Sequence, residues 1–168
     1  MSDVKNLTSK EAIEKLQELS TNSDFCMFIT NLFHIPFSGR PMSTQEVDDE
    51  GNIWFMSREG SEKNNDIELD NRVQLIYCNN KSLEYLSVYG EAEILKDRAK
   101  IGDLWTPIAK TWFNEGKDDP EITLIKVKPL DAYYWDTKNN KMVSLIKMLV
   151  GAIAGKEFDG GVEGKIKV

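Results

Sequence analysis

The segment from Arg40 to Lys63, RPMSTQEVDDEGNIWFMSREGSEK, constrains the fold more than any other part of the chain. Residues 40–46 and 53–57 have the composition of strands. The acidic segment between them, DDEGN, is typical of a turn that joins two antiparallel strands. A Ser/Gly/Lys loop then leads into a short helical segment, expected at residues 61–69. We therefore expect an antiparallel hairpin whose second strand ends at the start of a helix.

The loop at the end of this hairpin carries side chains suited to an anion. Ser57, Ser61 and Lys63 lie close together in the sequence, just ahead of unpaired N–H groups and the positive end of a helix dipole. Arg40 flanks the same hairpin and adds a second cation. The alternative account makes Ser61 an ordinary helix cap and Lys63 a surface charge. The convergence of two cations and two hydroxyls on one strand end favours the anion site.

The remaining segments predict a small antiparallel barrel. Apolar and β-branched runs predict four more strands, at residues 25–32, 73–78, 85–95 and 122–127, the last extended by Tyr133, Tyr134 and Trp135. Further helices are expected at residues 8–21, 97–113 and 142–154. Gly90 interrupts its strand and predicts a bulge or a close backbone approach. Six short strands with a few helices indicate a mainly β fold, a six-stranded antiparallel barrel.

Composition limits the partners and the location. The 168 residues suffice for one domain, expected over residues 1–155, with a flexible C-terminal tail over residues 156–168. The net charge of −7 argues against nucleic acid and anionic membranes as partners. No signal peptide is evident at the start. Cys26 and Cys78 lie in apolar runs, which predicts buried free thiols and a cytoplasmic protein.

Several kinds of chemistry are not expected. With one histidine, His34, and two distant cysteines, the sequence offers no metal site. A hydrolytic triad would need His34 as its base, and this residue fits better at a loop or barrel rim. Neither a P-loop nor a dinucleotide-binding glycine motif is present.

An ordered set of segments resembles the pyridoxamine 5′-phosphate oxidase-like flavin-binding split barrels, most closely the general stress protein 26 branch. The resemblance covers roughly residues 8–155 and implies a six-stranded split β-barrel of the FMN-binding type. The matching segments are RPMST at 40–44, NIWFMS at 52–57, SEK at 61–63, YGEA at 89–92, WFNEGKDDP at 112–120, KP at 128–129 and YYWD at 133–136.

This resemblance implies FMN bound at a homodimer interface. Ser61 and Lys63 would hold the phosphate, and Trp135 would lie near the isoalloxazine of the partner subunit's flavin. For Trp135, a core or interface aromatic is the alternative interpretation. FAD or a deazaflavin would fit the same cradle. The residues that would line the cofactor are Arg40, Pro41, Met42, Ser43, Thr44, Met56, Ser57, Ser61, Lys63 and Trp135.

Departures from the family pattern bear on the reaction. The oxidases carry a lysine where this chain has Gln45, and an arginine and a histidine at about the places of Lys141 and Val143. Those side chains contact the vitamin substrate, so pyridoxamine phosphate oxidation is not expected and no catalytic residue is assigned. Two hypotheses remain: a flavin-dependent oxidoreductase acting on a small redox substrate, and a non-catalytic flavin carrier or redox and stress sensor.

Overall fold

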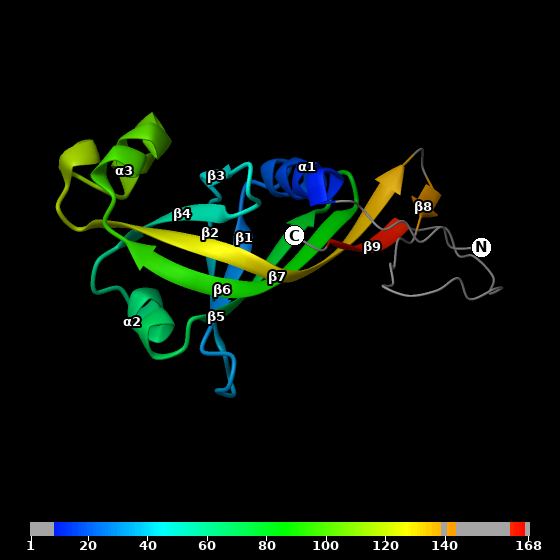
Figure 1. Cartoon of the computed structure of the whole chain (residues 1–168), viewed down its shortest axis with the longest axis horizontal. Helices are drawn as coiled ribbons and strands as arrows, with labels where there is room; N and C mark the ends of the chain where they lie inside the picture. The colour runs from blue at the N-terminus through cyan, green and yellow to red at the C-terminus, as the bar shows by residue number, and fades with distance from the viewer. Residues whose placement is uncertain (1–8, 139–140, 144–161, 167–168) are drawn as a thin grey trace.

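The computed structural model of the chain describes residues 9–138, 141–143 and 162–166 (Figure 1). Its strands are β1 (Cys26–Thr30), β2 (Ser38–Met42), β3 (Glu46–Val47), β4 (Ile53–Arg58), β5 (Arg72–Asn79), β6 (Glu84–Leu95), β7 (Ile122–Lys138), β8 (Lys141–Val143) and β9 (Val162–Ile166). Its helices are α1 (Ser9–Thr21), α2 (Glu62–Leu69) and α3 (Arg98–Leu104), with 3₁₀ turns η1 (Pro107–Thr111) and η2 (Gly116–Asp118). The strands form one antiparallel sheet in the order β2-β1-β5-β6-β7-β4-β3, and β8 and β9 both pair with β7.

The sheet curls into a half-barrel whose concave side holds the core. Strands β1 and β4 are separated in the order by three others, which would place them roughly 19 Å apart in a flat sheet. Yet the rings of Phe28 on β1 and Phe55 on β4 meet edge to face with centroids 5.1 Å apart. Both rings are completely buried. The apolar faces of distant strands therefore meet because the sheet closes on itself.

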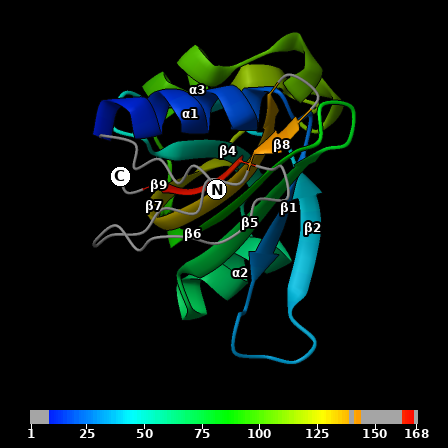
Figure 2. The same cartoon turned by 90° about the vertical axis from the view of Figure 1, so that its right-hand side faces the viewer.

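Helices α1 and α2 lie on opposite sides of the curled sheet (Figure 1, Figure 2). The apolar stripe of α1, formed by Ala12, Leu16 and Leu19, is buried in the main core. Gln17 on the same helix donates a hydrogen bond to the backbone carbonyl of Val47 at 3.0 Å, which fixes α1 over the β3 end of the sheet.

A second, smaller apolar cluster lies between α3 and the sheet. Its members are Trp54, Ile101, Leu104, Phe113, Ile122 and Leu124. The helix predicted over residues 97–113 is wrong in its length. It ends at Leu104, and Pro107 begins a separate 3₁₀ turn because proline lacks the N–H that a continuing α-helix requires. Within the described residues, no helix is long and apolar enough to cross a membrane.

The predicted mainly β antiparallel fold is confirmed, but the continuous sheet has seven strands rather than six. The difference arises at residues 40–46, which form two strands. Strand β2 pairs with β1, whereas β3 pairs with β4. Of the predicted first strand of the hairpin, therefore, only Glu46 and Val47 pair with the second strand. Pro41 sits in β2 at the edge of the sheet, where the missing N–H costs no ladder hydrogen bond.

The C-terminal region differs from expectation where it is described. Met142 and Val143 lie in strand β8, and residues 144–154 of the predicted helix lie outside the described residues. Within the expected flexible tail, Val162–Ile166 form β9, which pairs with Ala132–Asp136 of β7. The rest of that tail lies outside the described residues, and the domain boundary at residue 155 stays a prediction.

The two cysteines are free, but only one of them is buried. Cys26 lies inside the barrel, where burial raises the pKa of its thiol to about 12. Cys78 is exposed, so the prediction that both thiols are buried is wrong. The alternation along β5 explains this: Leu75 and Tyr77 point into the core and Cys78 points to the opposite face.

Gly90 lies at the predicted close approach. The register of β6 against β7 shifts between Tyr89 and Gly90, and a Cβ at position 90 would lie 2.5 Å from the backbone oxygen of Lys128. We expect Gly90→Ala to lower the free energy of unfolding by about 1–3 kcal/mol, measured by urea denaturation. The matched control is Gly102→Ala in α3, where a Cβ meets nothing within 4 Å, and which should be neutral or stabilising. Equal stabilities for the two variants would contradict the crowding at β7.

The turn between β3 and β4 is held by one carboxylate. Asp48 accepts hydrogen bonds from the backbone N–H groups of Glu50 and Asn52 at 3.0 and 2.8 Å, and from the indole of Trp54 at 2.8 Å. Gly51 turns the chain at a φ of 84°. Partial burial by itself raises the pKa of Asp48, but these hydrogen bonds outweigh it and lower the pKa below its ordinary value of 3.8.

Acid should therefore weaken this turn. A carboxyl whose pKa is lower in the folded state stabilises the fold above its unfolded pKa, and that contribution is lost as the pH falls through the folded value. We expect the Tm advantage of the wild type over Asp48→Asn to shrink as the pH falls from about 5 to about 2. Thermal melts across this range provide the test, with the exposed neighbour substitution Asp49→Asn as the control. A constant difference across the range would refute this role.

Candidate functional site

The predicted anion-binding side chains lie at the start of α2, the helix that contacts β1 and β2 on one side and β4 on the other. Ser57 lies near the end of β4, and Ser61 immediately precedes α2. Their hydroxyl oxygens lie 3.2 Å apart, and the ammonium of Lys63 donates to the Ser61 hydroxyl at 3.3 Å. The structure thus places Ser57, Ser61 and Lys63 in one cluster, which we call the α2 cradle.

Arg40 reaches the same region from the other end of the sheet. Its guanidinium donates to the Thr30 hydroxyl at 2.6 Å and lies 3.6 Å from the carboxylate of Asp66 on α2. Thr30 in turn donates to Asp66 at 2.5 Å. These contacts attach α2 to β1 and β2, while the serines attach it to β4.

The charge around Lys63 favours an anion. Burial, and then the positive charge of Arg40, lower the pKa of the Lys63 ammonium below its ordinary value of 10.5. Arg40 is neutralised by Asp66, but Lys63 makes no ion pair within the described residues. A half-buried, unpaired cation beside a second cation is stabilised when an anion binds.

The start of α2 is also open. Ser61 has the extended backbone of a helix N-cap, with φ −67° and ψ 152°, yet its side chain makes no capping hydrogen bond. The simple capping role considered from the sequence therefore does not account for this hydroxyl. The first N–H groups of an uncapped helix carry the positive end of its dipole and form a ready site for a phosphate.

Asn64 supports the cradle and was missed from the sequence. Its buried amide accepts a hydrogen bond from Ser57 at 2.7 Å and donates to the Thr123 hydroxyl at 3.0 Å. Thr123 closes the ring by donating to the backbone carbonyl of Ser57 at 3.2 Å. An asparagine within a polar helix carries no signal of this role, since its partner Thr123 lies on a distant strand.

The side chains at the end of β2 and in the segment that follows it, residues 41–44, point in different directions. Met42 is buried in the main core, and Pro41 and Ser43 are exposed. Thr44 is held by a hydrogen bond of 2.6 Å to the hydroxyl of Tyr77, and burial raises the pKa of this tyrosine well above its ordinary value. Met42 could therefore reach a ligand only through its backbone.

Two predicted site residues lie away from the cradle within this chain. Met56 packs against the cluster beneath α3, on the opposite face of β4 from Ser57. Trp135 lies far along β7 from Thr123, at up to about 40 Å for an extended strand. Its ring packs on Tyr133 with centroids 4.4 Å apart. The placement of Trp135 beside a flavin stays a prediction that requires a second chain.

Comparison with known proteins decides the family. The model of the family described as pyridoxamine 5′-phosphate oxidase like matches residues 11–159. The chain belongs to this family. A curated relative, protein bli-3 of Neurospora crassa, is 25% identical over 156 residues, which is 87% of this chain and 75% of the relative. The family predicted from the segments at 40–63 and 112–136 is thereby confirmed.

Solved structures share the fold of this chain. A Clostridium acetobutylicum protein related to general stress protein 26 has a TM-score of 0.65 and 24% identity, covering 80% of this chain and 93% of its own. A Xanthomonas citri protein described as a general stress FMN/FAD binding protein has a TM-score of 0.65 and 23% identity, covering 86% and 100%. At these identities the likeness shows the split-barrel fold.

Proposed function

We propose that this member of the pyridoxamine 5′-phosphate oxidase-like family binds FMN, with the phosphate in the α2 cradle, and serves as a flavin-dependent oxidoreductase of the general stress protein type. The observation that carries the proposal is the unpaired ammonium of Lys63 beside an uncapped helix start and the hydroxyls of Ser57 and Ser61. Phosphate oxygens are the acceptors that such a donor set favours. The fold shared with an FMN/FAD binding protein of Xanthomonas citri supports it.

The proposed binding unit is a homodimer. The convex face of the sheet carries partly exposed apolar and aromatic side chains from β1, β5 and β7, namely Met27, Ile29, Ile76, Tyr133 and Trp135. A face of this kind is typical of a two-fold interface. Packing two such faces together would let Trp135 of one chain approach the cradle of the other.

The loop between β1 and β2 adds to this support. It projects beyond the rest of the molecule in both views (Figure 1, Figure 2) and carries the exposed side chains of Phe33, Ile35 and Phe37. Apolar side chains this far from their own core gain most by packing on a second copy. The free cysteines fit a cytoplasmic location for this dimer.

In this proposal the bound flavin supplies the redox chemistry, and the chain binds and orients it. The residues of the α2 cradle hold the phosphate, and the backbone of residues 40–44 borders the ring side. Gln45, in place of the oxidases' lysine, donates its amide to the Ser43 carbonyl at 3.0 Å, which does not suit a second phosphate. This contact favours a substrate other than pyridoxamine phosphate. Because no residue is assigned to a substrate, a non-catalytic flavin carrier or sensor is the second candidate function.

Comparing FMN with riboflavin tests the cradle, since the two ligands differ only in the phosphate. We expect FMN to bind at least about tenfold more tightly, because only FMN forms charge-assisted hydrogen bonds in the cradle. Quenching of flavin fluorescence on titration into cofactor-free protein measures both affinities. FAD and a deazaflavin phosphate should be titrated alongside, to decide among the phosphate-bearing flavins. Equal affinities for FMN and riboflavin would place the phosphate outside the cradle.

Turnover separates the two candidate functions. The oxidoreductase predicts that NADH or NADPH bleaches the bound flavin and that an acceptor restores it over many cycles. The carrier or sensor predicts no reduction by either donor, while FMN binding is unchanged. Stopped-flow absorbance of the loaded protein distinguishes these outcomes.

A further inference from the structure

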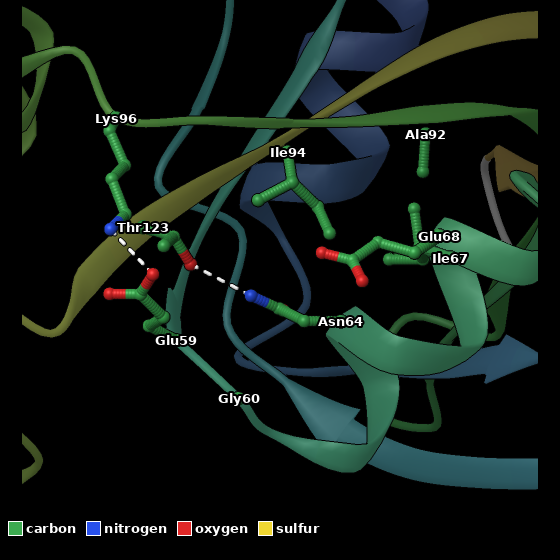
Figure 3. Close-up of a pocket in the computed structure, with 9 residues that line it drawn as sticks. All are labelled: Glu59, Gly60, Asn64, Ile67, Glu68, Ala92, Ile94, Lys96 and Thr123. Atoms are coloured by element: carbon green, nitrogen blue, oxygen red, sulfur yellow. Dashed lines mark hydrogen bonds and ion pairs between the residues drawn. The ribbon is translucent and has the colours of Figure 1, made fainter.

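A cavity of about 380 Å³ opens on the side of α2 that faces β6. Its apolar floor is formed by Ile67 of α2 and by Ala92 and Ile94 of β6 (Figure 3). Ile67 and Ala92 are almost completely buried. The volume lies at the lower end of the range for small-molecule sites.

The cavity is distinct from the α2 cradle. Asn64 lies between them, and both ends of its amide are already engaged, one by Ser57 and the other by Thr123. The hydrogen bond between Asn64 and Thr123 lies between the Glu59–Lys96 pair and the side chains of Ile94 and Glu68 (Figure 3). None of Ser57, Ser61 and Lys63 lines the cavity.

The lining of the cavity is negative. At its outer end Lys96 donates to Glu59 at 2.5 Å, so these two charges neutralise each other. The carboxylate of Glu68 turns into the space between α2 and Ile94 (Figure 3). Glu68 makes no ion pair within the part of the chain that the structure describes. One uncompensated carboxylate above an apolar floor repels anions and attracts a cation with an apolar body.

We propose that this cavity binds a small organic ammonium ion. The ammonium donates charge-assisted hydrogen bonds to the Glu68 carboxylate, and a short alkyl chain covers Ile67, Ala92 and Ile94. The Glu59–Lys96 pair is already neutral, so it offers no free charge to a second charged group on the ligand. Ser57, Ser61 and Lys63 do not line the cavity, so the proposed ammonium and the FMN phosphate would contact different side chains.

Titration of the purified full-length chain with n-butylammonium chloride, followed by amide NMR, tests the proposal. Saturable shifts are expected at Ala92 and Ile94. Sodium butyrate, which has the same alkyl length and the opposite charge, should produce none at the same concentration and ionic strength. Glu68 is exposed, so water screens its charge, and Glu68→Gln should weaken butylammonium binding about two- to fivefold.

Glu93→Gln provides the matched control, because Glu93 is exposed and points away from the floor formed by its neighbours Ala92 and Ile94. This variant should bind butylammonium like the wild type. Three results would overturn the proposal: equal responses to butylammonium and butyrate, no saturable response at millimolar concentrations, or wild-type affinity in Glu68→Gln. None of these outcomes depends on whether FMN binds.

Discussion

Replacing Lys63 by alanine is expected to weaken FMN binding about ten- to a hundredfold while the barrel stays folded. A charge-assisted hydrogen bond contributes about 1.5–3 kcal/mol, which converts to this range of affinity. The loss should be specific to the phosphate, because the only hydrogen bond of the Lys63 ammonium among the described residues is to Ser61, and Lys63 lies outside both apolar clusters. Fluorescence titration with FMN and with riboflavin measures the effect, and riboflavin affinity should not change.

Two control variants sharpen this experiment. Lys63→Arg keeps a cation at the start of α2 and should restore much of the affinity. Lys81→Ala removes the same charge from the exposed turn between β5 and β6 and should leave FMN binding as in the wild type. If Lys63→Ala bound FMN like the wild type, the phosphate would have to sit elsewhere.

The largest expected effect on stability comes from Phe55→Ala. Phe55 is completely buried and holds β4 against Phe28 on β1, across the closure of the half-barrel. Removing a buried phenyl ring costs about 3–5 kcal/mol, because the lost contacts and the cavity left behind both count against the folded state. For a chain of this length that lowers Tm by roughly 6–20 °C.

Calorimetry of the wild type and Phe55→Ala measures this shift. The control is Ile108→Ala, since Ile108 in η1 is 76% exposed and its removal should change stability by less than about 0.5 kcal/mol. A Phe55→Ala variant as stable as the Ile108 control would mean that the sheet does not depend on this closure.

The class of the fold was predictable because periodicity is local. The apolar run at residues 73–78 predicted β5, alternation along residues 85–95 predicted β6, and the glycine at position 90 predicted the break in register. Pairing is not local, and this explains the main error. Residues 40–46 look like one strand from composition alone, but the chain leaves the sheet after Met42 and returns at Glu46 on the other side of the closure. The prediction that residues 40–57 form a single hairpin was therefore wrong.

The candidate site was predictable in part for the same reason. Ser57, Ser61 and Lys63 are close in the sequence, and their clustering followed from one strand–loop–helix unit. Arg40 joins them only because the sheet curls, through contacts to Thr30 and Asp66 that no sequence pattern marks. In the proposed dimer, the placement of Trp135 beside a flavin depends on a second chain, so neither periodicity nor the fold of one chain determines it.

The most direct test of FMN binding is the visible absorption spectrum of the purified protein, with mass identification of whatever is released on denaturation. We expect a flavin spectrum and the release of FMN, or quantitative uptake of added FMN by colourless protein. A colourless protein that takes up no FMN at micromolar concentrations would contradict it.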